Sequence, residues 1–107
     1  MDNEFKILRE KYRQTLLAYR SELQLALSHA DVECIRKIAH KVAGTALSFE
    51  FDAISELAKK LENYCTEFEK NFPKAATDAV GALSFLSEAR VLIGQFSALV
   101  QMESTER

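Results

Sequence analysis

Residues 5–27, FKILREKYRQTLLAYRSELQLAL, decide the fold class, because their apolar side chains recur at steps of three or four residues. The recurring residues are Phe5, Leu8, Tyr12, Leu16, Tyr19, Leu23 and Leu27. Steps of three and four place side chains on one face of an α-helix. The stretch therefore predicts a long amphipathic helix over residues 3–28, whose apolar face must be covered by other helices.

Three further segments repeat this pattern, and they predict helices over residues 31–50, 52–72 and 75–102. Their apolar stripes are Ile35, Ile38, Val42, Ala46 and Phe49; Ile54, Leu57, Leu61, Tyr64, Phe68 and Phe72; and Leu86, Ala89, Ile93, Phe96 and Val100. Asp31 and Asp52 are the predicted N-caps, and Pro73 marks the corner before the last helix. No segment of useful length alternates with period two. We predict an all-α, antiparallel up-and-down four-helix bundle that forms a single domain over residues 1–107.

Composition narrows the function classes. The net charge of −2 gives no broad attraction to nucleic acid or to an anionic membrane. No apolar run approaches the roughly 20 residues that a bilayer requires, and the charged N-terminus does not resemble a signal peptide. Cys34 and Cys65 form no CxxC pair, which favours a reducing compartment. We expect a cytoplasmic monomer that binds neither nucleic acid nor membrane.

The second predicted helix carries one of the two histidines, His40, on the side opposite its apolar stripe. At roughly 100° per residue, the same outward strip also holds Gly44 and Leu47, together with Glu33, Arg36 and Lys37. An exposed histidine with charged neighbours is most often an ordinary surface residue. Gly44 argues against that reading, because glycine in a helix interior costs roughly 1 kcal/mol relative to alanine and here removes bulk beside the imidazole.

The stretch AHKVAGTALSFEFDAISELAKKLE, residues 39–62, resembles the histidine-containing phosphotransfer (HPt) domains of two-component phosphorelays. The family pattern is a histidine, commonly a lysine three residues later, then a glycine and small residues, and a following helix that often ends in an LE-like pair. The resemblance implies that His40 is the phosphoacceptor. It also implies that Gly44 clears space for a partner and that Glu62 hydrogen-bonds one imidazole nitrogen. A carboxylate that accepts from Nδ1–H would fix the tautomer and leave Nε2 as the nucleophile.

The resemblance also suggests which residues support the transfer and which contact the partner. Positive charge for the phosphoryl group and for an acidic docking partner would come from Arg36, Lys37, Lys41 and Lys59. The partner-docking residues would be Ala43, Gly44, Leu47 and Ser48. Three positions depart from the family pattern: Ala43 stands where lysine is common, Leu47 where a small residue is usual, and Glu50 where glycine is frequent.

In the function that the resemblance implies, His40 accepts a phosphoryl group from an aspartyl phosphate of a response-regulator receiver domain and passes it to another receiver. The partners would be receiver domains and a hybrid histidine kinase, and the receiver would supply Mg²⁺. The sequence has no Walker-type loop, no GxGxxG and no kinase ATP-binding pattern. We therefore predict a phosphotransfer intermediate that does not phosphorylate itself and that needs no cofactor of its own.

A helical adaptor that binds receiver domains or other signalling partners without carrying phosphate is the main alternative, supported by Ala43 and Glu50. A metal or haem site is much weaker, because His29 and His40 lie eleven residues apart across a helix break with no third ligand in view. A nucleic-acid interface is disfavoured because acidic residues are interspersed among the basic ones. A hydrolase built on paired carboxylates would need a cleft that a small bundle does not suggest.

Overall fold

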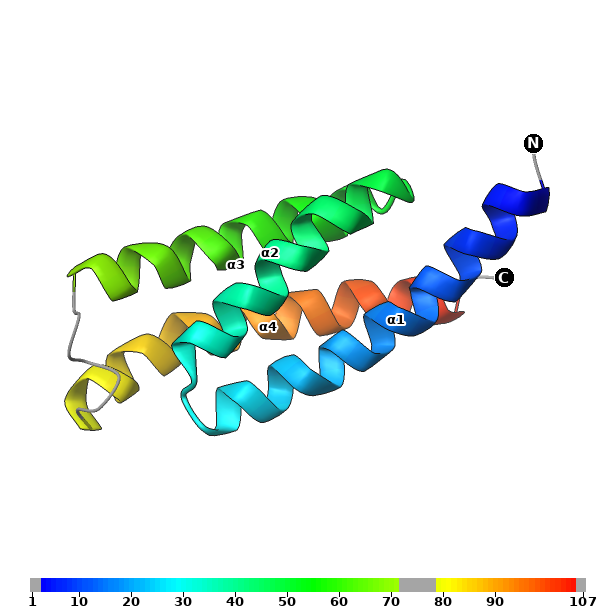
Figure 1. Cartoon of the computed structure of the whole chain (residues 1–107). Helices are drawn as coiled ribbons and strands as arrows, with labels where there is room; N and C mark the ends of the chain where they lie inside the picture. The colour runs from blue at the N-terminus through cyan, green and yellow to red at the C-terminus, as the bar shows by residue number, and fades with distance from the viewer. Residues whose placement is uncertain (1–2, 72–78, 106–107) are drawn as a thin grey trace.

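The computed structural model describes residues 3–71 and 79–105, and within them the chain forms four helices and no strand. The helices are α1 (Asn3–Ser28), α2 (Val32–Ser48), α3 (Asp52–Asn71) and α4 (Ala79–Thr105). Successive helices run in opposite directions, as Figure 1 shows, and they pack into an elongated bundle. The all-α antiparallel four-helix bundle predicted from the apolar stripes is therefore confirmed.

Helices α1 and α2 both end in the same hydrogen-bonded motif. At the end of α1, the backbone N–H of Ala30 donates to Leu27 and that of Asp31 donates to Ala26. At the end of α2, Glu50 donates to Leu47 and Phe51 to Ala46 in the same pattern. This Schellman motif requires a left-handed residue just after the helix, and here those residues are Ala30 and Glu50, with φ of 52° and 65°. The left-handed Glu50 also explains why α2 ends at Ser48 and not at the predicted residue 50.

The helix starts show one predicted cap and one different arrangement. Asp31 is the N-cap of α2, since its side chain accepts a hydrogen bond from the backbone N–H of Cys34 at 3.1 Å. Asp52 was predicted to cap α3, but it is the first helical residue, and the carbonyl of the preceding Phe51 accepts the first helical bond, from Ser55. Asp52 is still favourably placed, because a carboxylate in the first turn interacts well with the helix dipole. Residues 72–78, with Phe72 and Pro73, lie outside the described residues.

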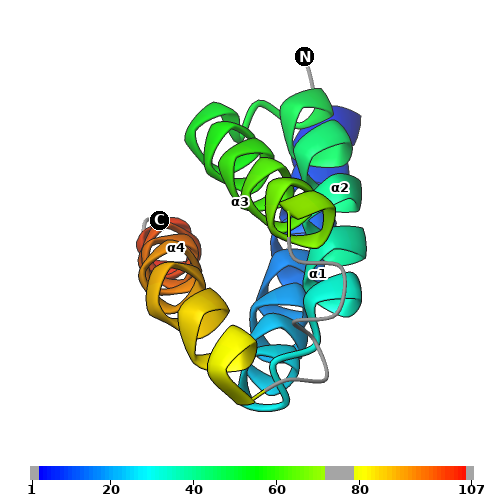
Figure 2. The same ribbon diagram turned by 90° about the vertical axis from the view of Figure 1, so that its left-hand side faces the viewer.

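The core is formed by the inward faces of all four helices. Its largest fully buried side chains include Leu16 and Leu23 of α1, Ile35 and Val42 of α2, Ile54 and Leu61 of α3, and Phe85 and Phe96 of α4. Helix α2 packs against α1 and α3, whereas α4 packs against α1 and α3 on the other side (Figure 2). Helices α2 and α4 are therefore diagonal neighbours, and the outer face of each is turned away from the other.

Two predicted core residues of α1 are exposed, because α1 extends beyond the α2–α3 corner (Figure 1). Phe5 is 37% exposed and Leu8 is 51% exposed. Phe5 still stacks on Phe49, with ring centroids 6.2 Å apart. The helical spacing correctly identifies the face of α1, but it does not indicate how much of that face a neighbouring helix covers.

One segment of the described residues, Leu83–Glu103 in α4, is long and apolar enough to cross a membrane by length and composition. The expectation that no run reaches this length is therefore wrong. A third of the segment is buried inside the bundle, and core helices of water-soluble bundles satisfy the same criterion. Its length and composition are only a weak indication of a membrane span. They do show that α4 carries apolar side chains on its outer face as well as on its inner one.

Candidate functional site

The candidate site lies on the outer face of α2, where His40 is the most distinctive residue. The His40 side chain is 73% exposed, whereas Ala39 and Val42 beside it in the sequence are buried in the core. The helical wheel therefore assigns the face of His40 correctly. An imidazole in this position is open to a protein partner.

Glu62 of α3 reaches His40 across the groove between the two antiparallel helices. Its Oε2 lies 2.7 Å from Nδ1 of His40, and only 26% of the Glu62 side chain is exposed. A carboxylate can only accept, so the hydrogen bond places the ring proton on Nδ1. Nε2 of the neutral ring then carries the free lone pair and is the nitrogen available for attack.

Gly44 follows His40 by one helical turn, and the space beside it is open. Apart from its chain neighbours and the backbone of α2 itself, no heavy atom of the described residues would lie within 4 Å of a Cβ atom built at Gly44. The backbone of Gly44 is ordinary helix, without a positive φ. Neither local packing nor backbone conformation therefore requires glycine here.

The other three predicted docking residues divide into two groups. Leu47, which is 53% exposed, and Ser48 are both at the surface near Gly44. Ala43 is only 6% exposed and packs in the core, so its side chain is not available for docking. The carbonyl oxygen of Ala43 accepts a hydrogen bond from Oγ of Ser55 on α3, at 2.7 Å.

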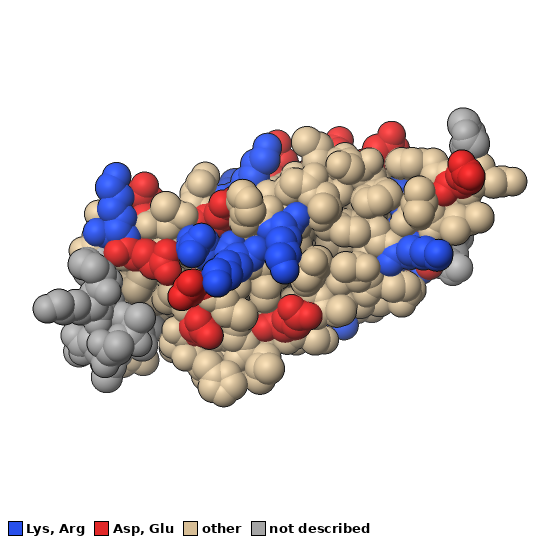
Figure 3. All heavy atoms as spheres, in the orientation of Figure 1, with Lys and Arg blue, Asp and Glu red and all other residues tan. Residues whose placement is uncertain are grey.

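The four predicted basic residues also differ in what they contact. Arg36 donates from Nε to Glu69 of α3 at 3.0 Å, which directs its charge away from His40. Lys37 pairs with Glu33 one turn earlier on α2, at 3.3 Å. Lys41 and Lys59 are exposed and have no ion pair with any residue that the structure describes. Figure 3 shows basic side chains gathered over α2 with acidic groups beside them.

Two polar contacts behind the site were not foreseen from the sequence. Ser55 is the one buried polar side chain among the described residues, and its bond to Ala43 joins α3 to the turn that follows His40. On the opposite side of α2, Oγ1 of Thr45 bonds to the hydroxyl of Tyr12 on α1 and donates to the carbonyl of Lys41 at 2.8 Å. These contacts hold the Lys41–Thr45 turn on both sides. A serine within an apolar stripe is the only sequence signal that could have suggested the first of them.

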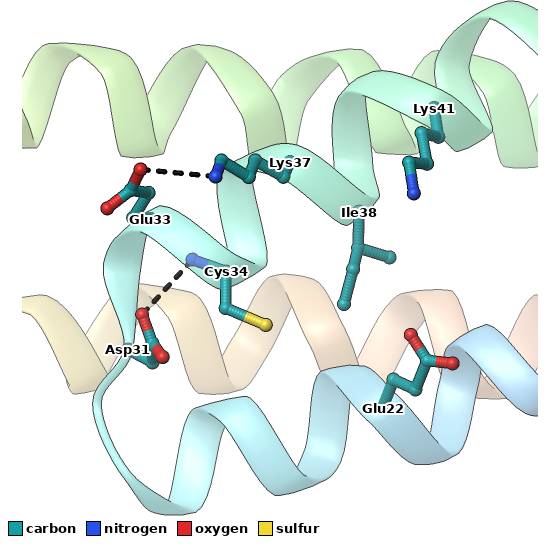
Figure 4. A pocket seen from close by; sticks show the side chains of 7 residues that line it. All are labelled: Glu22, Asp31, Glu33, Cys34, Lys37, Ile38 and Lys41. Atoms are coloured by element: carbon teal, nitrogen blue, oxygen red, sulfur yellow. Dashed lines mark hydrogen bonds and ion pairs between the residues drawn. The ribbon is translucent and has the colours of Figure 1, made fainter.

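A polar hollow of about 380 Å³ lies between α1 and α2, beside the site (Figure 4). Lys37, Lys41, Glu22 and Cys34 are among the residues that line it. Burial, together with the negative charges of Asp31 and Glu22, raises the pKa of the Cys34 thiol. Cys34 is therefore protonated at neutral pH and is a poor nucleophile.

The alternative of a metal site gains no support from the geometry. The described residues contain no group of three or more potential ligands. Nδ1 of His29 lies 3.1 Å from the carbonyl oxygen of Leu25, at the end of α1. The feature that distinguishes the described surface is thus an accessible imidazole with a carboxylate on one ring nitrogen and open space beside it.

The comparison with protein families agrees with this geometry. The family model of the Hpt domain matches residues 7–101, which is nearly the whole chain. The chain therefore belongs to the Hpt family, whose function is histidine phosphotransfer in phosphorelays and whose members interact with receiver domains. Proteins of this family are generally cytoplasmic signalling proteins. Neither the comparison with curated proteins nor that with solved structures gave a match.

Proposed function

We propose that His40 is the phosphoacceptor of this Hpt domain, taking a phosphoryl group from an aspartyl phosphate of one receiver domain and passing it to an aspartate of another. The observation that carries the proposal is the 2.7 Å contact between Nδ1 of His40 and Oε2 of Glu62 beneath an exposed ring. It directs the nucleophilic lone pair of Nε2 towards solvent, where a receiver can approach.

The chemical step balances without a proton acceptor for Nε2. The lone pair of neutral Nε2 attacks phosphorus, the N–P bond forms, and the bond from phosphorus to the aspartyl oxygen breaks. The aspartate leaves as a carboxylate, and the ring of His40, which keeps its Nδ1 proton, becomes cationic. The hydrogen bond to the Glu62 carboxylate, which has a charged acceptor from the start, then has a charged donor as well, and this stabilises the cationic ring.

The same arrangement supports the return step. An attacking aspartate of the second receiver displaces the imidazole, the N–P bond breaks, and the ring returns to its neutral form. Phosphoryl transfer depends mainly on positioning and on charge stabilisation. His40 and Glu62 supply the positioned nucleophile, Lys41 and Lys59 add unpaired positive charge on neighbouring surfaces, and we expect the receiver to bring Mg²⁺.

The proposal is tested by incubating the chain with receiver domains that have been phosphorylated on aspartate with labelled phosphate. Label should appear on the wild type, should be acid-labile, and should disappear in His40→Gln. His29→Gln is the matched control, because it removes the other histidine of the chain and should label normally. If no receiver from the source organism labels the wild type, the phosphotransfer proposal fails and the adaptor alternative is favoured.

A further inference from the structure

Helix α3 carries a strip of three polar residues, and each of them bonds to α2. Ser55, Glu62 and Glu69 follow one another at steps of seven residues, which is about two helical turns and keeps them on one side of the helix. Their partners follow in the opposite order along α2: they are Ala43, His40 and Arg36. We call these three contacts the α2–α3 polar seam. The contact between Glu62 and His40 is the middle one.

Ser55 forms the buried end of the polar seam. Its side chain is 1% exposed, and its Oγ donates to the carbonyl oxygen of Ala43 at 2.7 Å. A helical serine can donate instead to the carbonyl four residues earlier in its own helix. Here the bond crosses to a second helix, so it is made only when α3 lies at one level along α2.

The side chains around Ser55 are small. On α2, Ala39 and Ala46 share a face with Ala43, and on α3, Ala58 follows Ser55 by one turn; all four alanines are buried. Methyl groups let two helices approach closely, but they form only shallow ridges for the neighbouring helix to interlock with. In helix pairs, a single buried polar residue can fix a register that apolar packing leaves open. The bond from Ser55 is the contact behind His40 that can do so.

The level of α3 along α2 determines whether Glu62 meets His40. Side chains of a helix lean towards its N-terminus, so His40 leans away from Ala43, and Glu62 leans back towards Ser55. Because the two helices are antiparallel (Figure 1), these directions converge on the 2.7 Å contact between Oε2 and Nδ1. Good hydrogen bonds span only about 2.7–3.2 Å. A small shift of α3 along α2 therefore weakens the contact.

We propose that Ser55 is a positioning residue, whose bond to Ala43 holds α3 at the level where Glu62 keeps the proton of His40 on Nδ1. This deepens the proposed function and rests on it, because the tautomer affects transfer only if His40 accepts the phosphoryl group. Without the bond, Glu62 holds Nδ1–H less firmly, and more of the neutral rings carry their proton on Nε2. Such rings have no free lone pair on Nε2 and cannot attack phosphorus there.

The tautomer of His40 tests the proposal in the chain alone, without a receiver. The measurement is ¹⁵N NMR of the histidine-labelled chain at alkaline pH, where the ring is neutral, with His29→Gln as the background so that one histidine remains. Ser55→Ala should lower the ratio of Nδ1–H to Nε2–H by roughly 2- to 10-fold, the factor that corresponds to one ordinary hydrogen bond. The ratio should move towards that of Glu62→Ala, which lacks the carboxylate. Alanine is a good helix former, so the bundle stays folded.

Two further variants distinguish positioning from a general loss of stability. Tyr12→Phe is the matched control, because it also removes a hydroxyl that bonds to α2, but from the side of α1, at Thr45. It should leave the tautomer ratio at the wild-type value. Ser55→Thr keeps the hydroxyl, and it should return the ratio towards that value.

An unchanged tautomer ratio in Ser55→Ala overturns the proposal, as does an equal change in Tyr12→Phe. Single-turnover transfer at saturating receiver should slow in Ser55→Ala in proportion to the fraction of Nδ1–H, and a slower rate at an unchanged ratio also overturns it. The proposed function fails separately: if the ratio falls as expected but no receiver labels the wild type, Ser55 still positions Glu62, and His40 is not the phosphoacceptor.

Discussion

Replacing Gly44 by alanine should make the chain more stable and less active at once. In the interior of an exposed helix, alanine is favoured over glycine by about 0.8–1 kcal/mol. Beyond the helix's own backbone, no atom of the described part of the chain lies within 4 Å of the added methyl group, so no clash reduces that gain. For a domain of this size, about 1 kcal/mol corresponds to a rise in Tm of roughly 4–8 °C.

The same methyl group should obstruct the receiver. Added bulk in a closely packed contact typically costs about 1–3 kcal/mol, which corresponds to a decrease of roughly 5- to 150-fold in the rate of transfer to His40. Thermal unfolding followed by circular dichroism measures the first effect. Single-turnover transfer from a phosphorylated receiver, at limiting receiver concentration, measures the second.

Gly94→Ala is the matched control for this prediction. Gly94 is also exposed in a helix interior, and beyond its own helix backbone no described atom would lie within 4 Å of a Cβ there, but it lies on α4, diagonal to the site. It should raise Tm by a similar amount, and it should leave transfer unchanged. If Gly44→Ala is stabilised and still transfers phosphate at the wild-type rate, the argument that Gly44 admits a partner is refuted.

Three further predictions rest on other contacts of the described residues. Glu62→Gln keeps a hydrogen-bond acceptor but loses the charge. Because hydrogen bonds to charged groups contribute about 1 kcal/mol more than neutral ones, single-turnover transfer to His40 should slow by about fivefold. An unchanged rate would contradict the role given to the carboxylate. Glu50→Gly should raise the free energy of unfolding, measured in urea, by about 1 kcal/mol, because glycine adopts the left-handed conformation at φ 65° without strain. An equal gain in Glu50→Ala would show that the charge of Glu50, and not its backbone conformation, is responsible. Burial raises the pKa of Cys65 from 9.0 to about 12, so the stability linked to this thiol is present below pH 9.0 and is lost as the pH rises towards 12. Over that range the unfolding free energy of the wild type should fall more steeply than that of Cys65→Ala. Parallel curves for the two proteins would contradict the assignment.

The sequence predicts the fold and the outward position of His40 because both depend on helical spacing. The steps of three and four residues assign the inward faces of all four helices, and the same wheel turns His40 outward. The spacing is less informative about which parts of each helix its neighbouring helices cover. It does not indicate that α1 extends past its neighbours and leaves Leu8 exposed, nor that Ala43 turns towards α3. Those outcomes depend on the lengths and crossing of the helices.

The contacts between helices could be predicted only where a family resemblance supplied them. Glu62 lies at the edge of its own apolar stripe, and from spacing alone it would be taken for a solvated rim residue. Its contact with His40 needs the register of α2 against α3, to which the bond from Ser55 to Ala43 contributes. Likewise, the end of α2 at Ser48 follows from the left-handed Glu50, a conformation that no local propensity of glutamate predicts.

The most direct test of the central claim is to find the atom of the chain that carries the phosphoryl group. The chain labelled with ¹⁵N on its histidines can be phosphorylated by a receiver and examined by NMR for coupling between ³¹P and the imidazole nitrogens. The geometry predicts coupling to Nε2 of His40, with the proton retained on Nδ1 beside Glu62. Phosphate on Nδ1 of His40, on His29 or on no histidine at all would contradict it.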